Sequence, residues 1–123
     1  MLPPQHRLRR AAEVAAVSRQ GRRWQHPLVV MLLLARPEES PGPSRFAFAA
    51  SKRVGKAVVR NRAKRRMREI VRLRLNDLVP GSDCLFIARP GAAEASYVEL
   101  EEALTALLTR AGLFAGRTAS VPS

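Results

Sequence analysis

The residues of this chain with the most chemical potential are the cations between Lys52 and Arg74. This segment holds eleven Lys and Arg side chains against the single acid Glu69, so it carries ten of the twelve net positive charges. Dense positive charge attracts polyanions, above all the phosphate groups of nucleic acid. Arginine outnumbers lysine by 19 to 3. That ratio favours planar, two-pronged phosphate contacts, although a GC-rich genome would produce the same bias.

The triplet Arg60-Asn61-Arg62 has the most specific chemistry in this segment. Two forked guanidinium donors flank an amide that both donates and accepts hydrogen bonds. The triplet can therefore contact phosphate oxygens, a ribose hydroxyl or a base edge. Gly55, a few residues earlier, either lets the backbone pass close to a ligand or makes an ordinary turn. Three further cations surround this glycine: Lys52, Arg53 and Lys56.

Residues for protein-based catalysis are scarce. A self-sufficient nuclease needs a general base, a general acid or metal-binding carboxylates beside its basic surface. Glu69 is the only acid in the basic segment, and three acids at 99–102 suit the start of a helix. Cys84 is the only cysteine, so it cannot form an internal disulfide bond, and no zinc-ligand spacing joins it to a histidine. We expect Cys84 to be buried and the chain to have no catalytic residue.

The basic segment is expected to form a long helix over residues 57–78. Apolar residues recur there three, four and seven positions apart, which places them on one face against a sheet. Four arginines share the opposite face: Arg62, Arg65, Arg68 and Arg72. A charged face is usually only a solvated surface, but solvated faces mix charges of both signs. Cations three and four residues apart repel each other, so a bound phosphate backbone would stabilise this face.

Five shorter elements accompany this helix. Apolar runs and period-two alternation predict strands at 28–35, 45–51 and 83–89. Helices are expected at 11–20 and 97–112, because apolar residues recur there at helical spacing. A capping box of Ser96 and Glu99 begins the last helix.

Length and composition allow one hydrophobic core. The chain has 123 residues, of which 46% are apolar, so we expect a single domain of the α/β (α+β) class over residues 1–123. A small mixed sheet packed with helices would form a two-layer sandwich with its core at about 7–114. A disordered tail is expected at 115–123. The longest apolar run is far shorter than the ~20 residues of a transmembrane helix, and no signal-peptide pattern is present, so we expect a cytoplasmic protein.

The segment from Ser51 to Arg72 reads SKRVGKAVVRNRAKRRMREIVR. It resembles the signature of the bacterial ribonuclease P protein component, a family whose central Arg-Asn-Arg helix carries this motif. Other features follow in the family's order, so the resemblance covers roughly residues 7–114. These features are Arg7-Leu8, Gly21, the strand at 28–35, the run from Ile87 to Pro90 and the last helix.

The resemblance implies a fold and a function. Similar proteins have a ribosomal protein S5 domain 2-like sandwich with a left-handed β-α-β crossover. They bind a catalytic RNA that removes the 5′ leader of precursor tRNA by Mg²⁺-dependent hydrolysis. The enzyme is then the ribonuclease P holoenzyme, in which the RNA and not a protein side chain performs catalysis. Mg²⁺ acts with the RNA and no organic cofactor is implied. The implied partners are the catalytic RNA and the leader, with no membrane and no obligate protein partner.

Carried onto this sequence, the resemblance assigns two groups of contact residues. Contacts to the catalytic RNA fall on Lys52, Arg53, Lys56, Arg60, Asn61, Arg62, Lys64, Arg65 and Arg68. A cleft for the leader is expected among Val14, Val17, Ser18, Val29, Leu32, Phe46 and Phe48. Similar proteins usually bring aromatic side chains into this cleft from the first helix and first strand, whereas this chain has aliphatic residues and a serine there. The two phenylalanines serve either the core or base stacking.

Two other functions compete for the same basic helix. A general RNA-binding or ribosome-assembly protein would use the same charges. The test that separates it is whether the chain stimulates cleavage of precursor tRNA by ribonuclease P RNA at low Mg²⁺. A cationic membrane-surface helix needs a large aromatic or leucine face opposite its charges, which residues 57–78 lack.

Overall fold

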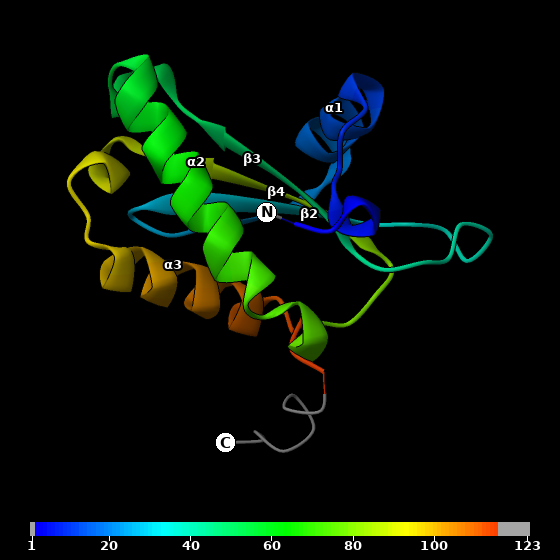
Figure 1. The fold of residues 1–123 in the computed structure, drawn as a ribbon. Helices are drawn as coiled ribbons and strands as arrows, with labels where there is room; N and C mark the ends of the chain where they lie inside the picture. The colour runs from blue at the N-terminus through cyan, green and yellow to red at the C-terminus, as the bar shows by residue number, and fades with distance from the viewer. Residues whose placement is uncertain (1, 116–123) are drawn as a thin grey trace.

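A four-stranded sheet with helices on both faces makes up the described part of the chain (Figure 1). The computed structural model describes residues 2–115. The strands are β1 (Arg22–Gln25), β2 (Val29–Ala35), β3 (Arg45–Ala50) and β4 (Ser82–Ala88). The α-helices are α1 (Ala11–Gln20), α2 (Ala57–Arg72) and α3 (Tyr97–Arg110). Short 3₁₀ helices are η1 (Pro4–His6), η2 (Lys52–Val54), η3 (Leu75–Asp77) and η4 (Pro90–Ala93).

The sheet is mixed, in the order β1-β2-β4-β3. β1 pairs antiparallel with β2 and β2 antiparallel with β4, while β3 runs parallel to β4. Parallel neighbours need a crossover connection, and the segment containing α2 supplies it. This arrangement confirms the expected α+β class, and β1 and β3 become the two opposite edges of the sheet. The left-handed sense of the crossover stays a prediction from the family resemblance.

The larger core lies between one sheet face and the helices α2 and α3. Alternate residues of the central strands point to this face, where Phe86 stacks between Phe46 and Phe48 with ring centroids 6.5 and 5.8 Å away. Helices α2 and α3 cover this layer with buried apolar side chains: Ala63, Met67, Ile70 and Val71 from α2, and Leu100, Leu104, Leu107 and Leu108 from α3. Cys84 is fully buried here, as predicted, and burial raises the pKa of its thiol.

The smaller core lies on the other face, under α1. Val17 of α1 and Leu8 pack there against the strand residues Val30, Leu32 and Leu85. Because α1 has only ten residues, it covers less of this sheet face than α2 and α3 together cover of the other.

Most predicted elements are confirmed, and two differ. The predicted strands and the helices at 11–20 and 97–112 match within two residues, and both bonds of the Ser96–Glu99 capping box are present. α2 ends at Arg72 rather than at 78. The chain then turns through η3, and this turn lets Leu75 and Leu78 pack against the larger core. β1 was not predicted, since its sequence RRWQ lacks apolar alternation and its pairing with β2 defines it.

The expected tail at 115–123 is only partly described. The Ala115 N–H donates to the Asp77 carbonyl, so the chain is still tied to the domain at this residue. The remainder, 116–123, lies outside the described residues. No helix within 2–115 is long and apolar enough to cross a membrane.

Candidate nucleic-acid interface

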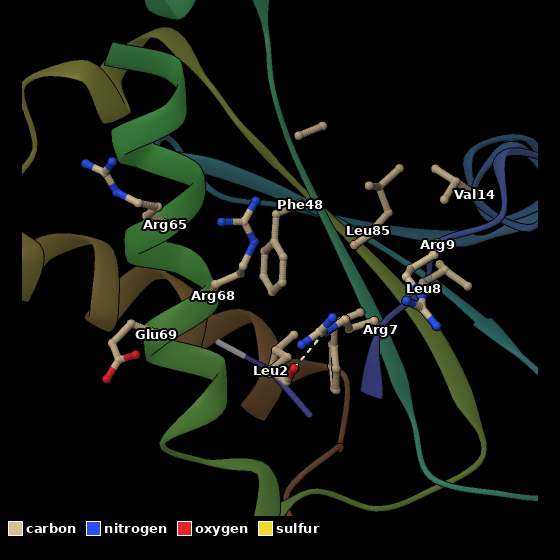
Figure 2. Close-up of a pocket in the computed structure, with 13 residues that line it drawn as sticks. Leu2, Arg7, Leu8, Arg9, Val14, Phe48, Arg65, Arg68, Glu69 and Leu85 are labelled. Atoms are coloured by element: carbon tan, nitrogen blue, oxygen red, sulfur yellow. Dashed lines mark hydrogen bonds between the residues drawn. The ribbon is translucent and has the colours of Figure 1, made fainter. Parts of the chain in front are cut away.

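A groove of about 830 Å³ runs along the β3 edge of the sheet, between α2 and the segment that leads into α1 (Figure 2). Its floor is the β3 edge, from which Ala47 and Ala49 point with Leu85 to the α1 face of the sheet, while Phe46 and Phe48 point to the α2 face. Ala47 and Ala49 stay half exposed because α1 packs mainly over β2 and β4. The groove therefore wraps around the edge strand that the short first helix leaves open.

The chain before α1 forms the wall opposite α2. The Leu8 N–H donates to the Phe46 carbonyl at 2.9 Å, which ties this segment to the beginning of β3. The Arg7 Nε donates to the Leu2 carbonyl at 2.7 Å and so fixes the position of its guanidinium. Leu2, Leu8 and Val14 make this wall largely apolar.

Four guanidiniums surround the apolar floor. Arg7 and Arg9 belong to the N-terminal wall, whereas Arg65 and Arg68 belong to α2. Glu69 is the single acid in the lining. Its hydrogen bonds from Arg72 lower the pKa of its carboxyl, so it stays charged and is already neutralised. A groove with an apolar floor and a cationic rim suits a single nucleic-acid strand, with bases below and phosphates above.

Phe48 is the aromatic side chain that a base could reach in this groove. Its ring is half exposed and stacks on Phe86 below, while the Arg68 guanidinium carbon lies 6.0 Å from the ring centroid. In Figure 2, Arg68 extends from α2 toward this ring. Phe46 also lines the groove but is only 3% exposed, so it serves mainly as core.

A second cationic surface begins beside the groove, at η2 and the first turns of α2. Lys52, Arg53, Lys56 and Arg65 are exposed. Gly55 sets the direction of the chain between η2 and α2 at a φ of 144°, where side chains are strained. A Cβ at this position would also lie 3.4 Å from the Val59 Cβ. Gly55 therefore turns the chain into α2, and its close approach to a ligand stays a prediction.

Some arginines of α2 are partly engaged in holding the fold. Arg62 Nη2 donates to the Ala93 carbonyl at 3.1 Å, and Arg66 Nη1 donates to the Ala95 carbonyl at 3.2 Å. Arg60 is half buried, and its Nε has no hydrogen-bond partner among the described residues. The predicted face of four arginines is therefore split. Arg62 leans toward η4, Arg68 leans over Phe48, and Arg65 and Arg72 remain exposed.

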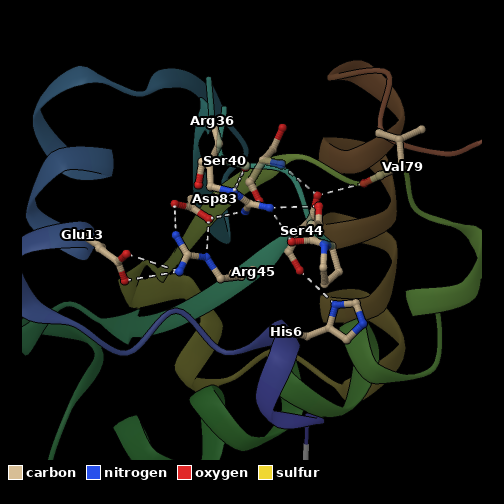
Figure 3. Close-up of polar contacts among 11 residues, drawn as sticks. His6, Glu13, Arg36, Ser40, Ser44, Arg45, Val79 and Asp83 are labelled. Atoms are coloured by element: carbon tan, nitrogen blue, oxygen red, sulfur yellow. Dashed lines mark hydrogen bonds and ion pairs between the residues drawn. The ribbon is translucent and has the colours of Figure 1, made fainter. Parts of the chain in front are cut away.

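A buried carboxylate at the start of β4 joins β3, α1 and the loop after β2 (Figure 3). Asp83 is 5% exposed and accepts from Arg36 Nη1 at 2.9 Å and from Arg45 Nε and Nη2 at 2.9 and 2.8 Å. These bonds raise the pKa of the Arg45 guanidinium. Arg45 also pairs with Glu13 of α1 at 3.3 Å. Arg36 holds the loop after β2 through the carbonyls of Ser40, Gly42 and Pro43.

Comparison with known proteins identifies the family. The sequence model of the Ribonuclease P family matches residues 2–112. The ribonuclease P protein component of Streptomyces bikiniensis is 45% identical over 116 residues, which cover 89% of this chain and 94% of the relative. The component of Roseiflexus castenholzii is 41% identical over 118 residues, or 95% of this chain and 94% of that one.

The chain belongs to the ribonuclease P protein family.

Solved ribonuclease P proteins share the fold. The protein from Thermotoga maritima superposes with a TM-score of 0.73 at 27% identity, covering 85% of this chain and 96% of that one. The protein from Staphylococcus aureus superposes with a TM-score of 0.78 at 24% identity, covering 89% of this chain and 97% of that one. At this identity the likeness supports the fold alone. As a ribonuclease P protein, the chain is a subunit in the processing of tRNA 5′ ends, and the family's catalysis resides in RNA.

The structure brings together only part of the leader cleft expected for a ribonuclease P protein. Val14, Phe46 and Phe48 line the groove. Val17 and Leu32 instead belong to the core under α1, and Val29 belongs to the larger core. With exposures of 0, 4 and 0%, these three have no surface for a ligand. Ser18 is exposed but does not line the groove. The nine predicted RNA-contact residues all lie on η2, α2 or the turn between them.

Several groove residues were not in the predicted set. Arg7, Leu8 and Arg9 come from the N-terminal segment, and Leu85 comes from β4. Six arginines lie between Arg7 and Arg23, with Glu13 as the single acid. This N-terminal arginine cluster was a usable signal for Arg7 and Arg9. Nothing in the sequence indicated that Leu85 faces the open side of the sheet, because β4 is apolar at nearly every position. Among residues 2–115, no three His, Cys, Asp or Glu side chains lie together as a metal site.

Replacing Asp83 with asparagine tests the clamp that this carboxylate forms with Arg36 and Arg45. Asp83→Asn leaves the Arg36 side chain, which is 9% exposed, without its counter-charge and leaves Arg45 paired with Glu13 alone, so the free energy of unfolding should fall by about 3 kcal/mol. Urea denaturation followed by circular dichroism measures this change. The matched control is Glu69→Gln, which removes a carboxylate whose ion pair with Arg72 is exposed and contributes little. Equal stability of Asp83→Asn and the unmodified chain would refute the clamp.

Proposed function

We propose that this chain assembles with the catalytic RNA of ribonuclease P and holds the 5′ leader of precursor tRNA in the groove beside β3. The catalytic RNA lies against the exposed cations of η2 and α2, and the leader passes between α2 and the N-terminal wall. The RNA performs the Mg²⁺-dependent cleavage, and the protein binds and orients its substrate. We also propose a cytoplasmic location, because both RNA partners are products of transcription.

The groove is the observation that carries this proposal. A general basic surface would bind a duplex through its phosphates alone. Here four guanidiniums surround an apolar floor in which one half-exposed aromatic ring is accessible. This combination favours a single strand, whose bases are free to stack. The α2 cations outside the groove provide the second, larger phosphate-binding surface.

Phe48 is proposed to replace the aromatic residues that similar proteins bring from the first helix and first strand. Val14 and Leu32 occupy those elements here, and Leu32 is buried. A leader base could stack on the open side of Phe48, where Arg68 already lies over the ring. Bases would then stack on the α2 side of the groove in this chain, and not on the side of the first helix as in similar proteins.

The proposal is tested by adding the chain to a bacterial ribonuclease P RNA at low Mg²⁺. Two RNA molecules repel each other when divalent cations are scarce, and bound protein cations reduce that repulsion. We expect faster cleavage of precursor tRNA at the mature 5′ end, measured by gel electrophoresis, and no cleavage by the chain without RNA. An unchanged rate with no shift of the RNA in a native gel would refute the proposal, whereas a shift without faster cleavage would favour the alternative of general RNA binding.

Arg53→Gln with Lys56→Gln should weaken binding to the catalytic RNA by about tenfold, because two exposed phosphate contacts outside the groove are lost. The logarithm of the binding constant should fall against the logarithm of salt concentration with a slope of roughly −5 to −7, and the variant's slope should be shallower by about 1–2. Filter binding at several salt concentrations measures both. Arg60 and Arg62 suit this test less well, because both are half buried.

The matched control for that pair changes the net charge equally at other exposed positions. Ser40→Asp with Asn76→Asp lowers the charge by two, in the loop after β2 and in η3. We expect its affinity for the catalytic RNA to stay close to that of the unmodified chain. Equal losses in the two variants would mean that total charge, and not the α2 surface, determines binding.

Phe48→Leu should weaken the holoenzyme's binding of precursor tRNA by roughly tenfold, since stacking on an aromatic ring contributes about 1–3 kcal/mol per base. Binding of a tRNA without a leader should not change, and the difference between the two substrates isolates the leader. Phe46→Leu is the control, because Phe46 is buried under the same helix. It should lower stability without a leader-specific effect. Unchanged leader dependence in Phe48→Leu would rule out stacking at this ring.

A further inference from the structure

The arginines near the N-terminus divide between opposite edges of the sheet. Arg7 and Arg9 line the groove beside β3. Arg22 and Arg23 lie on β1, at the other edge, and Arg19 lies in the last turn of α1 just before it. The groove and α2 therefore account for only part of this cluster, and the remainder forms a separate cationic region.

This region, the β1-edge patch, consists of Arg19, Arg22, Arg23 and Arg110. All four side chains are exposed. Arg110 ends α3 and joins the patch because its Nη1 donates to the Gln25 carbonyl at 2.9 Å. Within residues 2–115, none of the four forms an ion pair with a carboxylate. Three elements thus contribute unneutralised positive charge to one edge of the sheet.

Two of these guanidiniums are held in place. The Arg22 guanidinium carbon lies 4.9 Å from the centroid of the Trp24 ring, and Trp24 packs against the larger core below it. Arg110 is held by its bond to Gln25. Fixed arginines lose less freedom when they bind phosphate than freely rotating ones. Two of the four guanidiniums of the patch are therefore preorganised. The other two, Arg19 and Arg23, make no such contact within the described residues.

We propose that the β1-edge patch is a further RNA-binding surface, separate from the groove and from η2 and α2, which takes the phosphate backbone of an RNA segment other than the one in the groove. The inference rests on the proposed function, which supplies an RNA partner. Four strands separate the sheet edges by about 14 Å, three spacings of ~4.8 Å. The nucleotides held along β3 therefore do not touch β1, and an RNA strand has to leave the groove to contact it. Binding at both edges would make the protein a bridge between two RNA segments.

Edge protection alone does not explain the patch. Charged side chains on an edge strand prevent pairing with other sheets, and Arg22 and Arg23 on β1 would be sufficient for that. Protection of the edge strand gives no reason for Arg19 on α1 and Arg110 on α3 to border the same edge. Forked, two-pronged phosphate contacts account for all four arginines and for the lack of nearby carboxylates.

The test uses Arg19→Gln with Arg23→Gln, because neither side chain makes a hydrogen bond within the described residues and the Arg22–Trp24 contact stays intact. Filter binding to the catalytic RNA should show about tenfold weaker affinity and a salt slope shallower by about 1–2. Arg19→Lys with Arg23→Lys should retain most of the affinity. Ser40→Asp with Asn76→Asp is again the control for equal net charge.

Two RNA molecules could supply the segment, and the assay separates them. Weaker assembly with the catalytic RNA assigns the patch to that RNA. Normal assembly, followed by weaker binding of precursor tRNA to the saturated holoenzyme, assigns it to the precursor. Trp24 is the only tryptophan of the chain, so its fluorescence should also change when the RNA bound at this edge is added to the unmodified protein.

The inference is overturned if the Arg19→Gln, Arg23→Gln variant binds both RNA molecules with unchanged affinity and salt slope, or if the equal-charge control loses as much. Failure of the proposed function looks different. In that case the unmodified chain itself neither binds ribonuclease P RNA nor stimulates cleavage.

Discussion

Burial of one face of α2 is the interaction on which the rest of the molecule depends. This helix holds seven cations and a single acid in sixteen residues, and each pair of like charges four residues apart costs roughly 0.2–0.5 kcal/mol. Burying Met67, Ile70 and Val71 on the aromatic layer of the sheet contributes roughly 1.5–3 kcal/mol for each side chain. Packing therefore outweighs repulsion by several kcal/mol. The sheet in effect holds the cations in a position where an RNA can neutralise them.

The groove results from unequal cover on the two sheet faces. α2 and α3 together cover one face, while the ten-residue α1 covers only β2 and β4 on the other. The edge strand β3 stays open beyond Phe46, where the N-terminal segment joins it. Asp83 then connects β4 to β3 and, through Arg45 and Glu13, to α1, while Arg36 holds the loop after β2. Among the rim guanidiniums, Arg7 is held by its hydrogen bond to the Leu2 carbonyl.

Charge in this protein is arranged by the sheet as much as by the sequence. The strand order β1-β2-β4-β3 sends the two halves of the N-terminal arginine cluster to opposite edges. One half joins α2 around the groove, and the other half joins the end of α3 at β1. The RNA contacts proposed at both edges of the sheet would suit a subunit that holds RNA segments together while the RNA performs the chemistry.

The sequence by itself determined the helices, three of the strands, the burial of Cys84 and the presence of a cationic amphipathic helix. Local periodicity, capping residues and charge density are properties of contiguous segments, so they can be read without a fold. The structure decided which residues line the groove. Val29 and Leu32 lie on one strand, yet they are buried on opposite faces of the sheet, and Leu85 reaches the groove from the continuous apolar run of β4. The tertiary structure also decided that residues 22–25 form β1, which is a strand only because β2 pairs with it. It further decided which arginines lie at which edge of the sheet. These features depend on contacts between segments far apart in the chain, which sequence patterns do not encode.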